Sequence, residues 1–187
     1  MHRPLVAATM LALATTPAAA QDSTMTETPT RSAVPTAPAE DVSSIEAILT
    51  ALYDVISGPK GEARDWDRFR SLMLPEARLI PTGFPEGSSR ARAQMLGVED
   101  YITRSGPFLE ERGFFETEVG HLAERFENIA HVFSTYESRW NADDEEPFQR
   151  GINSIQLMWD GERWWVVNIM WRGVGPEHRI PEKYLSR

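Results

Sequence analysis

Four runs rich in β-branched and aromatic residues fill the second half of this chain, after a first half with helical periodicity. The runs span residues 114–126, 130–140, 148–159 and 163–172. Glu127-Asn128 and Asp160-Gly161 are tight-turn sequences, so we expect neighbouring runs to pair as hairpins of a meander. Helices followed by strands predict an α+β domain, in which a curved antiparallel sheet wraps around about three N-terminal helices. Such a sheet forms a cone with a pocket.

The second run decides which side chains could face that pocket. Alternation places His131, Phe133, Thr135, Glu137 and Arg139 on one face, and Val132, Ser134, Tyr136, Ser138 and Trp140 on the other. Neither face is uniformly polar, as expected when one face lines a pocket and the other packs or dimerises. We expect the first face, with its imidazole and carboxylate, to line the cone.

The first half predicts three helices. Ser43 and Glu46 have capping-box spacing before an apolar stripe, and Gly58-Pro59 ends that helix. Asp65 caps a second helix, which Pro75 closes.

A short strand is expected at 77–80, followed by a loop at 82–97 that could cover a cavity mouth. The third helix is expected at 98–104, where Ser105-Gly106-Pro107 interrupts it.

The N-terminus predicts export. Arg3, a short apolar stretch and the small residues before Gln21 form a signal peptide over residues 1–20, cleaved after Ala20. Residues 21–40 are rich in Thr, Ser, Pro and Ala, which is typical of a disordered linker. One domain is expected over 41–175, followed by a tail at 176–187. The mature protein is expected to be periplasmic or secreted, without a membrane span.

Charge and cysteine content exclude several function classes. Cleavage after Ala20 leaves 18 basic and 28 acidic residues, a net charge of −10, so the chain repels phosphate backbones and nucleic-acid binding is not expected. The absence of cysteine excludes a disulfide framework, a thiolate nucleophile and a Cys-based zinc site. The acidic run at 143–146 lacks ligand spacing and predicts a solvated turn, so we expect no metal. No phosphate-binding glycine loop occurs, and no cofactor is expected.

The candidate ligand-binding residues are polar groups within otherwise apolar elements. They are Tyr53, His131, Glu137, Arg139, Asn153 and Asn168. A carboxylate beside an imidazole in a dry cone could act as acid and base. The alternative is that Glu137 and Arg139 neutralise each other in a polar patch or at a dimer interface. The two asparagines could equally form structural hydrogen bonds, and for Tyr53 a core tyrosine with a satisfied hydroxyl is favoured over an acid catalyst.

Four sequence stretches resemble the nuclear transport factor 2-like superfamily, which includes SnoaL-type cyclases, ketosteroid isomerase and scytalone dehydratase. They are the capped first helix, Asp65-Trp66-Asp67-Arg68-Phe69, Pro75-Glu76-Ala77-Arg78-Leu79 and Gly161-Glu162-Arg163-Trp164-Trp165. The resemblance covers residues 42–172. It implies a cone fold, frequent homodimers through the sheet, and activities that range from enzyme to binder.

Catalytic residues of these families carry over only in part. Tyr53 matches the tyrosine of ketosteroid isomerase, but its base falls on Pro81 and its second acid near Ile155. That proton abstraction therefore has no evident acceptor here. Against scytalone dehydratase, Glu62 matches the acidic residue, whereas the neighbouring tyrosine falls on Gly61.

Three functions remain as hypotheses. The first is an exported protein, expected as a homodimer, that binds a small and mostly apolar molecule. The second is a cofactor-free lyase or isomerase with Glu137 or Glu62 as base and His131 or Tyr53 as acid. The third is a dimerisation module without ligand, for which the cone would be filled.

Overall fold

A computed structural model describes residues 34–186 as four α-helices, six strands and one 3₁₀-helix. The predicted signal peptide and most of the predicted linker lie outside the described residues. The helices are α1 (Ala39–Val42), α2 (Ile45–Ile56), α3 (Trp66–Leu72), α4 (Val98–Arg112) and η1 (Glu182–Tyr184). The strands are β1 (Met73–Gly83), β2 (Arg92–Ala93), β3 (Phe115–Phe126), β4 (Ile129–Arg139), β5 (Gln149–Trp159) and β6 (Trp164–Val174).

The six strands form one sheet in the order β2-β1-β6-β5-β4-β3. Strands β3 to β6 pair with their sequence neighbours as an antiparallel meander, which confirms the expected hairpins. Strand β1 runs parallel to β6, so the sheet is mixed rather than purely antiparallel. The α+β class and the curved, unclosed sheet are confirmed.

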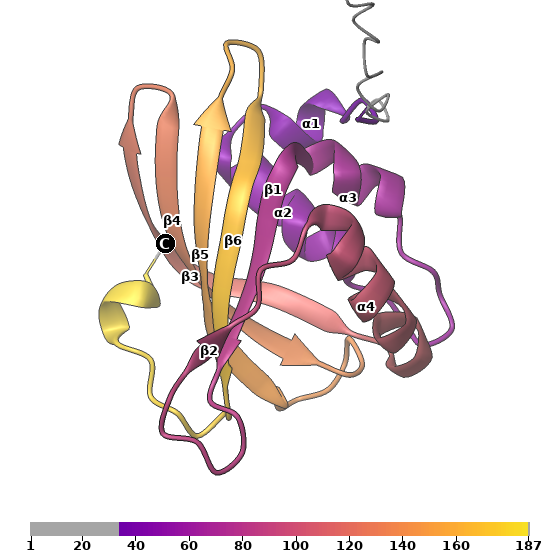
Figure 1. The fold of residues 1–187 in the computed structure, drawn as a ribbon, viewed down its shortest axis with the longest axis vertical. Helices are drawn as coiled ribbons and strands as arrows, with labels where there is room; N and C mark the ends of the chain where they lie inside the picture. Colours follow the sequence, from indigo (N-terminus) through magenta and orange to yellow (C-terminus); the bar gives the residue numbers. More distant parts are fainter. Residues whose placement is uncertain (1–33, 187) are drawn as a thin grey trace, which may run out of the picture. The chain divides into compact units, whose positions relative to one another are not determined.

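The helices lie on one side of the sheet, and the chain after β6 returns on the other side (Figure 1). Strands β3, β4 and β5 bend strongly, so that their lower ends run beneath the helices (Figure 1). Curvature of this kind encloses space at one end of the sheet, between its inner face and the helices.

The core forms where the apolar stripe of α2 meets the inner face of the sheet. Ile48, Leu49 and Leu52 of α2 are buried in one cluster with Val132 of β4 and Ile155 of β5. Helical spacing of three and four places the α2 residues on one side, and strand alternation does the same for the sheet residues. Burial of these side chains is the main stabilising contribution.

Three local boundaries differ from the sequence expectations. Ser44, rather than Ser43, caps α2 by accepting a hydrogen bond from the amide of Ala47. Pro75 does not close α3, which ends at Leu72; it lies within β1, where the pairing with β6 shifts register and the lost amide is tolerated. Pro107 does not interrupt α4.

Tertiary packing explains why α4 continues through its predicted break. Gly106 lies directly under the ring of Trp66, where even a methyl group would approach the ring to 3.2 Å. Leu109, three residues later and nearly one turn further along α4, is buried. These contacts hold the helix although Pro107 cannot donate a backbone hydrogen bond.

The segment at 176–187, expected as a tail, docks on the sheet over its described part. Ile180 is buried, and the carbonyl of Tyr184 accepts a hydrogen bond from the hydroxyl of Thr135 at 2.7 Å. The carbonyl of Ser186 accepts a hydrogen bond from the amide of His121 at 3.1 Å. This segment therefore covers part of the face opposite the helices.

Arg64 joins the end of α2 to the end of α4. Its buried guanidinium donates hydrogen bonds to the carbonyls of Ile56 at 2.9 Å, Gly58 at 2.6 Å and Leu109 at 3.1 Å. A planar group with several fixed donors suits this cluster of carbonyls better than an ammonium group does. Within residues 34–186, no helix is long and apolar enough to cross a membrane.

Replacing Ser44 by Ala should lower the free energy of unfolding by about 1 kcal/mol, because the N-cap acceptor of α2 is lost. For a domain of this size we expect the midpoint of thermal unfolding to fall by about 3–4 °C. Ser43→Ala is the matched control, since Ser43 is exposed and does not cap α2. Equal effects of the two variants, measured by circular dichroism melting, would contradict the assigned cap.

Replacing Arg64 by Lys should destabilise the domain by about 2–3 kcal/mol, because one ammonium group leaves several buried carbonyls without a donor. Chemical denaturation followed by tryptophan fluorescence measures this difference. Arg70→Lys, at a half-buried residue that is ion-paired with the exposed Glu99, serves as the comparison, with an expected loss of about 0.5 kcal/mol. A loss at Arg64 no greater than that at Arg70 would refute the assigned role.

Candidate functional site

A pocket of about 250 Å³ opens between the helices and the inner face of the curved sheet. Helices α2, α3 and α4 supply one wall, and strands β1, β3, β4, β5 and β6 supply the other. The lining is formed by Leu52, Tyr53, Ile56, Phe69, Leu79, Tyr101, Ser105, Phe108, Leu109, Phe114, Glu116, Tyr136, Gln149, Asn153, Ile155, Ile169 and Trp171. Most of these side chains are apolar or aromatic, as in typical small-molecule sites.

Packed aromatic rings shape the wall on the α4 side. Tyr101 stacks on Phe69 with ring centroids 5.3 Å apart and meets Trp171 edge to face at 6.2 Å. The hydroxyl of Tyr101 has a hydrogen bond with Ser105 one turn later, and burial raises its pKa. The wall is therefore rigid and offers flat apolar surfaces to a ligand.

A second group of aromatic residues lies near Phe108 and Phe114 of the lining. Trp140 stacks on Phe148 with centroids 3.8 Å apart, and Phe114 meets Phe148 edge to face at 6.3 Å. The guanidinium of Arg112 lies 5.3 Å from the ring of Phe108. Phe108 itself is 44% exposed, which places it at the solvent side of the pocket.

Glu116 places a carboxylate in this apolar surrounding. It lies at the start of β3, opposite Ser138 of β4, whose hydroxyl donates a hydrogen bond to it at 2.9 Å. Burial raises the pKa of Glu116 from 4.5 to about 7, against the lowering effect of hydrogen bonds from Ser138 and Asn153. The residue is half-buried, and it lines both the pocket and the groove between α2 and β3. Glu116 can thus hold or release a proton near neutral pH.

Tyr53 lies beside Glu116 and joins helix to sheet. Its hydroxyl is 2.5 Å from the hydroxyl of Ser134 on β4, and it accepts a hydrogen bond from the amide of Asn153 on β5 at 3.1 Å. All three side chains are buried. Burial is the largest cause that raises the pKa of Tyr53, and the charge of Glu116 raises it further. The phenol therefore stays protonated.

A β-bulge extends this network to the outside. The pairing of β3 with β4 shifts register between Glu118 and Gly120, so that Glu118 and His121 lie on the same face of the strand. Ser134 donates a hydrogen bond to Glu118 at 2.5 Å, and the other oxygen of Glu118 lies 3.1 Å from Nδ1 of His121. Hydrogen bonds thus run without interruption from Asn153 in the pocket wall to His121.

Tyr136 reaches the pocket because the residue opposite it is glycine. Gly151 of β5 pairs with Tyr136, and a Cβ at Gly151 would lie 2.5 Å from the tyrosine hydroxyl. Any larger residue would displace the ring. Burial raises the pKa of Tyr136, and the charge of Glu116 adds to this effect.

The face of β4 that was expected to line the pocket does not line it. His131, Glu137 and Arg139 lie on the outward face, whereas the inner face carries the fully buried side chains of Val132 and Ser134. The inner face is the less charged one because it covers the apolar stripe of α2. A carboxylate flanked by arginines keeps access to water on the outer face.

The outward residues pair with one another or with neighbouring strands. Arg139 donates to Glu137 at 2.9 Å, and Arg150 of β5 donates to the other oxygen of Glu137. Burial opposes ionisation of Glu137, but the two arginines outweigh it and lower its pKa. Nε2 of His131 lies 2.9 Å from the hydroxyl of Ser154. These side chains do not touch the pocket.

Of the remaining candidate residues from the sequence, two line the pocket and two lie outside it. Tyr53 and Asn153 line the pocket. Asn168 pairs with Gln156 on the outward side, and Glu62 is an exposed residue of the α2–α3 connection. Ligand binding by Tyr53 and Asn153 stays a prediction.

Glu116 is the carboxyl group of the pocket lining, and it was not among the residues expected from the sequence. The strand pattern of residues 114–126 contains several glutamates, and nothing local distinguishes one from another. The available signal was the small hydroxyl residues on β4, Ser134 and Ser138, which leave room for acids on the neighbouring strand. Within residues 34–186, no three histidine, aspartate or glutamate side chains come together as metal ligands.

Comparison with known proteins gives similarity in structure only. No protein-family model matches the chain, and no curated protein matches its sequence. A protein of unknown function with a cystatin-like fold from Nostoc punctiforme has a TM-score of 0.53 at 9% identity, covering 70% of this chain and 88% of that one. LinA has a TM-score of 0.52 at 8% identity, covering 74% and 92%. An NTF-2-like protein of unknown function from Silicibacter pomeroyi has a TM-score of 0.49 at 13% identity, covering 71% and 94%.

At such identities the Nostoc punctiforme protein and LinA, whose TM-scores exceed 0.5, show a shared fold and carry no information about activity. The order of helices, the curved six-stranded sheet and the pocket beneath α2 agree with the resemblance found in the sequence. The described part of this chain has the nuclear transport factor 2-like fold.

Proposed function

We propose that the pocket binds a small, uncharged and mostly apolar molecule, and that Glu116 transfers a proton to or from it. The reaction class is a cofactor-independent lyase or isomerase step. One observation carries the proposal: a carboxyl group with a pKa of about 7 lies in an otherwise apolar and aromatic pocket. A general acid or base works best when its pKa is close to the working pH.

The lining supports an uncharged ligand. Within the described residues, Glu116 is the one ionisable carboxyl group of the pocket wall, and no lysine or arginine accompanies it there. An anionic ligand would be repelled by Glu116 and would find no cation to pair with. A volume of about 250 Å³ accommodates a compact ligand with a flat apolar body.

The polar wall supports a role in chemistry beyond binding. Holding a carboxyl group away from water costs free energy, and an apolar ligand gains little from it. Tyr53 and Asn153 lie beside Glu116 and can orient a polar group of the ligand towards it. Such an arrangement of an acid-base group and orienting groups is typical of catalytic sites. Glu116 replaces Glu137 and Glu62 as the proposed base.

A second candidate function is binding without turnover. It is favoured by the pairing of Glu116, Ser138, Asn153 and Tyr53 with one another, which satisfies these groups without a ligand. A ligand-free dimerisation module is less well supported, because it requires a filled cone and the pocket is open.

Two further proposals rest on the sequence and the fold family. We infer that the chain is exported, from the signal-peptide pattern of residues 1–20. We also infer a homodimer through the outward face of the sheet. Met170, 45% exposed, is an apolar contact available on that face.

The difference in stability between the natural protein and Glu116→Gln should depend on pH. The pKa of Glu116 is 4.5 in the unfolded chain and about 7 when folded, so its favourable contribution is complete below pH 4.5. That contribution decreases by about 3 kcal/mol as the pH rises to 7, because ionisation favours the unfolded chain. Urea denaturation from pH 4 to 8 measures the difference.

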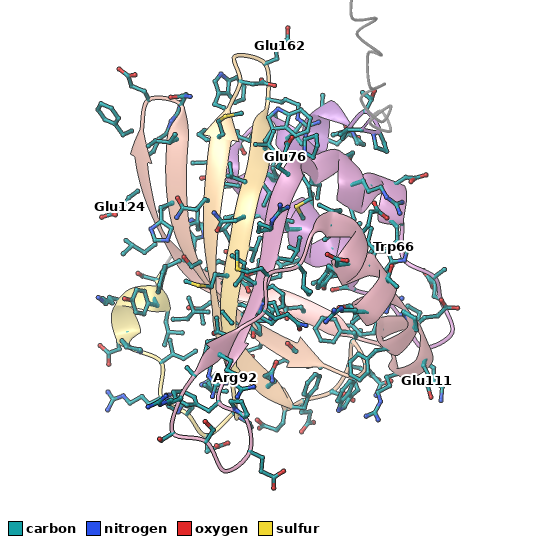
Figure 2. The ribbon with its side chains drawn as sticks, in the orientation of Figure 1. Trp66, Glu76, Arg92, Glu111, Glu124 and Glu162 are labelled. Carbon is teal, nitrogen blue, oxygen red and sulfur yellow. The ribbon has the colours of Figure 1, made fainter. Side chains whose placement is uncertain are left out.

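Glu124→Gln is the matched control for this measurement, because Glu124 is exposed and projects from the free edge of the same strand (Figure 2). Its stability difference from the natural protein should show no step between pH 4.5 and 7. A flat profile for Glu116→Gln would show that the carboxyl group is not buried as described.

The test of catalysis begins with identifying a small molecule that remains bound to the protein through purification. Native mass spectrometry of the purified full chain gives the mass of a bound compound, which is then incubated with fresh protein. We expect turnover that rises or falls through pH 7, and a loss of about 100-fold or more in Glu116→Gln with binding retained. Turnover unchanged in that variant would overturn the role of Glu116. Binding without turnover by the natural protein would support the second candidate function.

A further inference from the structure

We propose that Tyr53, Ser134 and Glu118 form a proton path between the pocket and His121, and that Glu118 sets its direction. The path removes the proton that a hydroxyl group of the ligand gives up at Tyr53. This inference rests on the proposed function, since it serves the same pocket.

The direction follows from the number of protons on each group. Ser134 has one hydroxyl proton, and it donates this proton to Oε1 of Glu118 at 2.5 Å. The short contact of 2.5 Å between Ser134 and Tyr53 must therefore use the proton of Tyr53. The oxygen of Tyr53 in turn accepts a hydrogen bond from Asn153. Every proton of this chain points away from the pocket and towards Glu118.

Because its own proton is directed outward, Tyr53 offers the pocket an acceptor oxygen. A ligand hydroxyl that donates to Tyr53 completes a continuous chain of four hydrogen-bonding groups. As the ligand O–H bond breaks, an O–H bond forms on Tyr53. The former proton of Tyr53 passes to Ser134, and the proton of Ser134 passes to Glu118. The net result is one proton moved from the ligand to Glu118, with no change of oxidation state.

The inner part of this path excludes water. Ser134 is 0% exposed and Tyr53, which also lines the outer groove, is 7% exposed, so the step between these two hydroxyl groups is made directly and not through bulk water. Chains of hydrogen bonds in a low-dielectric interior polarise one another, which favours such transfer.

The outer end is open and acidic. The side chains of Glu118 and His121 are each 18% exposed, and both line a groove between α2 and β3. The other ionisable groups of that groove are Glu46, Tyr53 and Asp54 from α2 and Glu116 from β3; Asp54 also pairs with Arg68. This surrounding negative charge attracts a proton to the outer end, where His121 or water can accept it.

Glu116 and Glu118 then have different roles in proton transfer. Glu116 contacts the pocket directly, whereas Glu118 is reached from the pocket through Tyr53 and Ser134. A reaction that takes one proton and returns another at a second position uses two such groups in different surroundings. Ser134 and Glu118 are positioning residues in this scheme, since neither touches the ligand.

The test follows the hydroxyl proton of Tyr53 in the full chain. With ¹³C-labelled tyrosine, NMR measures how fast this proton exchanges with solvent in the natural protein, Glu118→Gln and Glu124→Gln. Glutamine keeps the shape of Glu118 but cannot take up a proton. We expect exchange to slow by about tenfold or more in Glu118→Gln and to stay unchanged in Glu124→Gln.

If Glu118 had a purely structural role, the exchange of the Tyr53 hydroxyl proton would change in the opposite direction in Glu118→Gln. Loss of its hydrogen bond to Ser134 would then loosen the network, and exchange through local opening would become faster. Exchange that is faster or unchanged in Glu118→Gln therefore overturns the proposal.

A measurement on the natural protein covers the case in which Glu118→Gln does not fold. Exchange through the path is independent of phosphate buffer concentration, because the internal transfers limit it. Exchange through local opening rises with phosphate concentration, and that result also overturns the proposal. Glu116→Gln separates this test from the proposed function. In that variant the exchange of Tyr53 persists even where turnover is lost.

Discussion

The enclosed space between α2 and the curved sheet is the constraint on which the rest of the site depends. The first turns of α2 pack against the sheet through Ile48 and Leu49, and its last turns border the open pocket. Any polar group that borders this space is largely cut off from water and must be paired or change its protonation. Tyr53, Ser134 and Asn153 are paired, and Glu116 shows the second response through its raised pKa.

The two faces of β4 illustrate how the fold sorts charge. The outward face pairs Glu137 with two arginines, whose attraction keeps its pKa low. The inward face has small hydroxyl side chains, Ser134 and Ser138, which donate hydrogen bonds to glutamates of β3. Two glutamates two positions apart on β3 therefore differ in surroundings: Glu116 lines both the apolar pocket and the groove between α2 and β3, whereas Glu118 lines the groove and not the pocket. That difference makes separate roles in proton transfer possible.

Much of the fold could be predicted from the sequence, because its signals are periodic. The stripe of α2, the turns at Glu127-Asn128 and Asp160-Gly161, and the alternation within the strands specify helices, hairpins and a meander. Boundaries set by contacts between distant segments were missed. Pro107 lies inside α4 because Trp66 and Gly106 pack together, and Pro75 lies inside β1 beside a register shift.

The sequence by itself determined an acidic, cysteine-free chain whose apolar pattern specifies an α+β cone, and it placed Tyr53 on the helix that borders the hollow. The tertiary structure decided which face of β4 turns inward and which carboxyl group lies in the pocket. Alternation defines two faces without saying which one is covered. The choice depends on long-range packing against α2 and on the β3 bulge, which turns Glu118 and His121 to the same side.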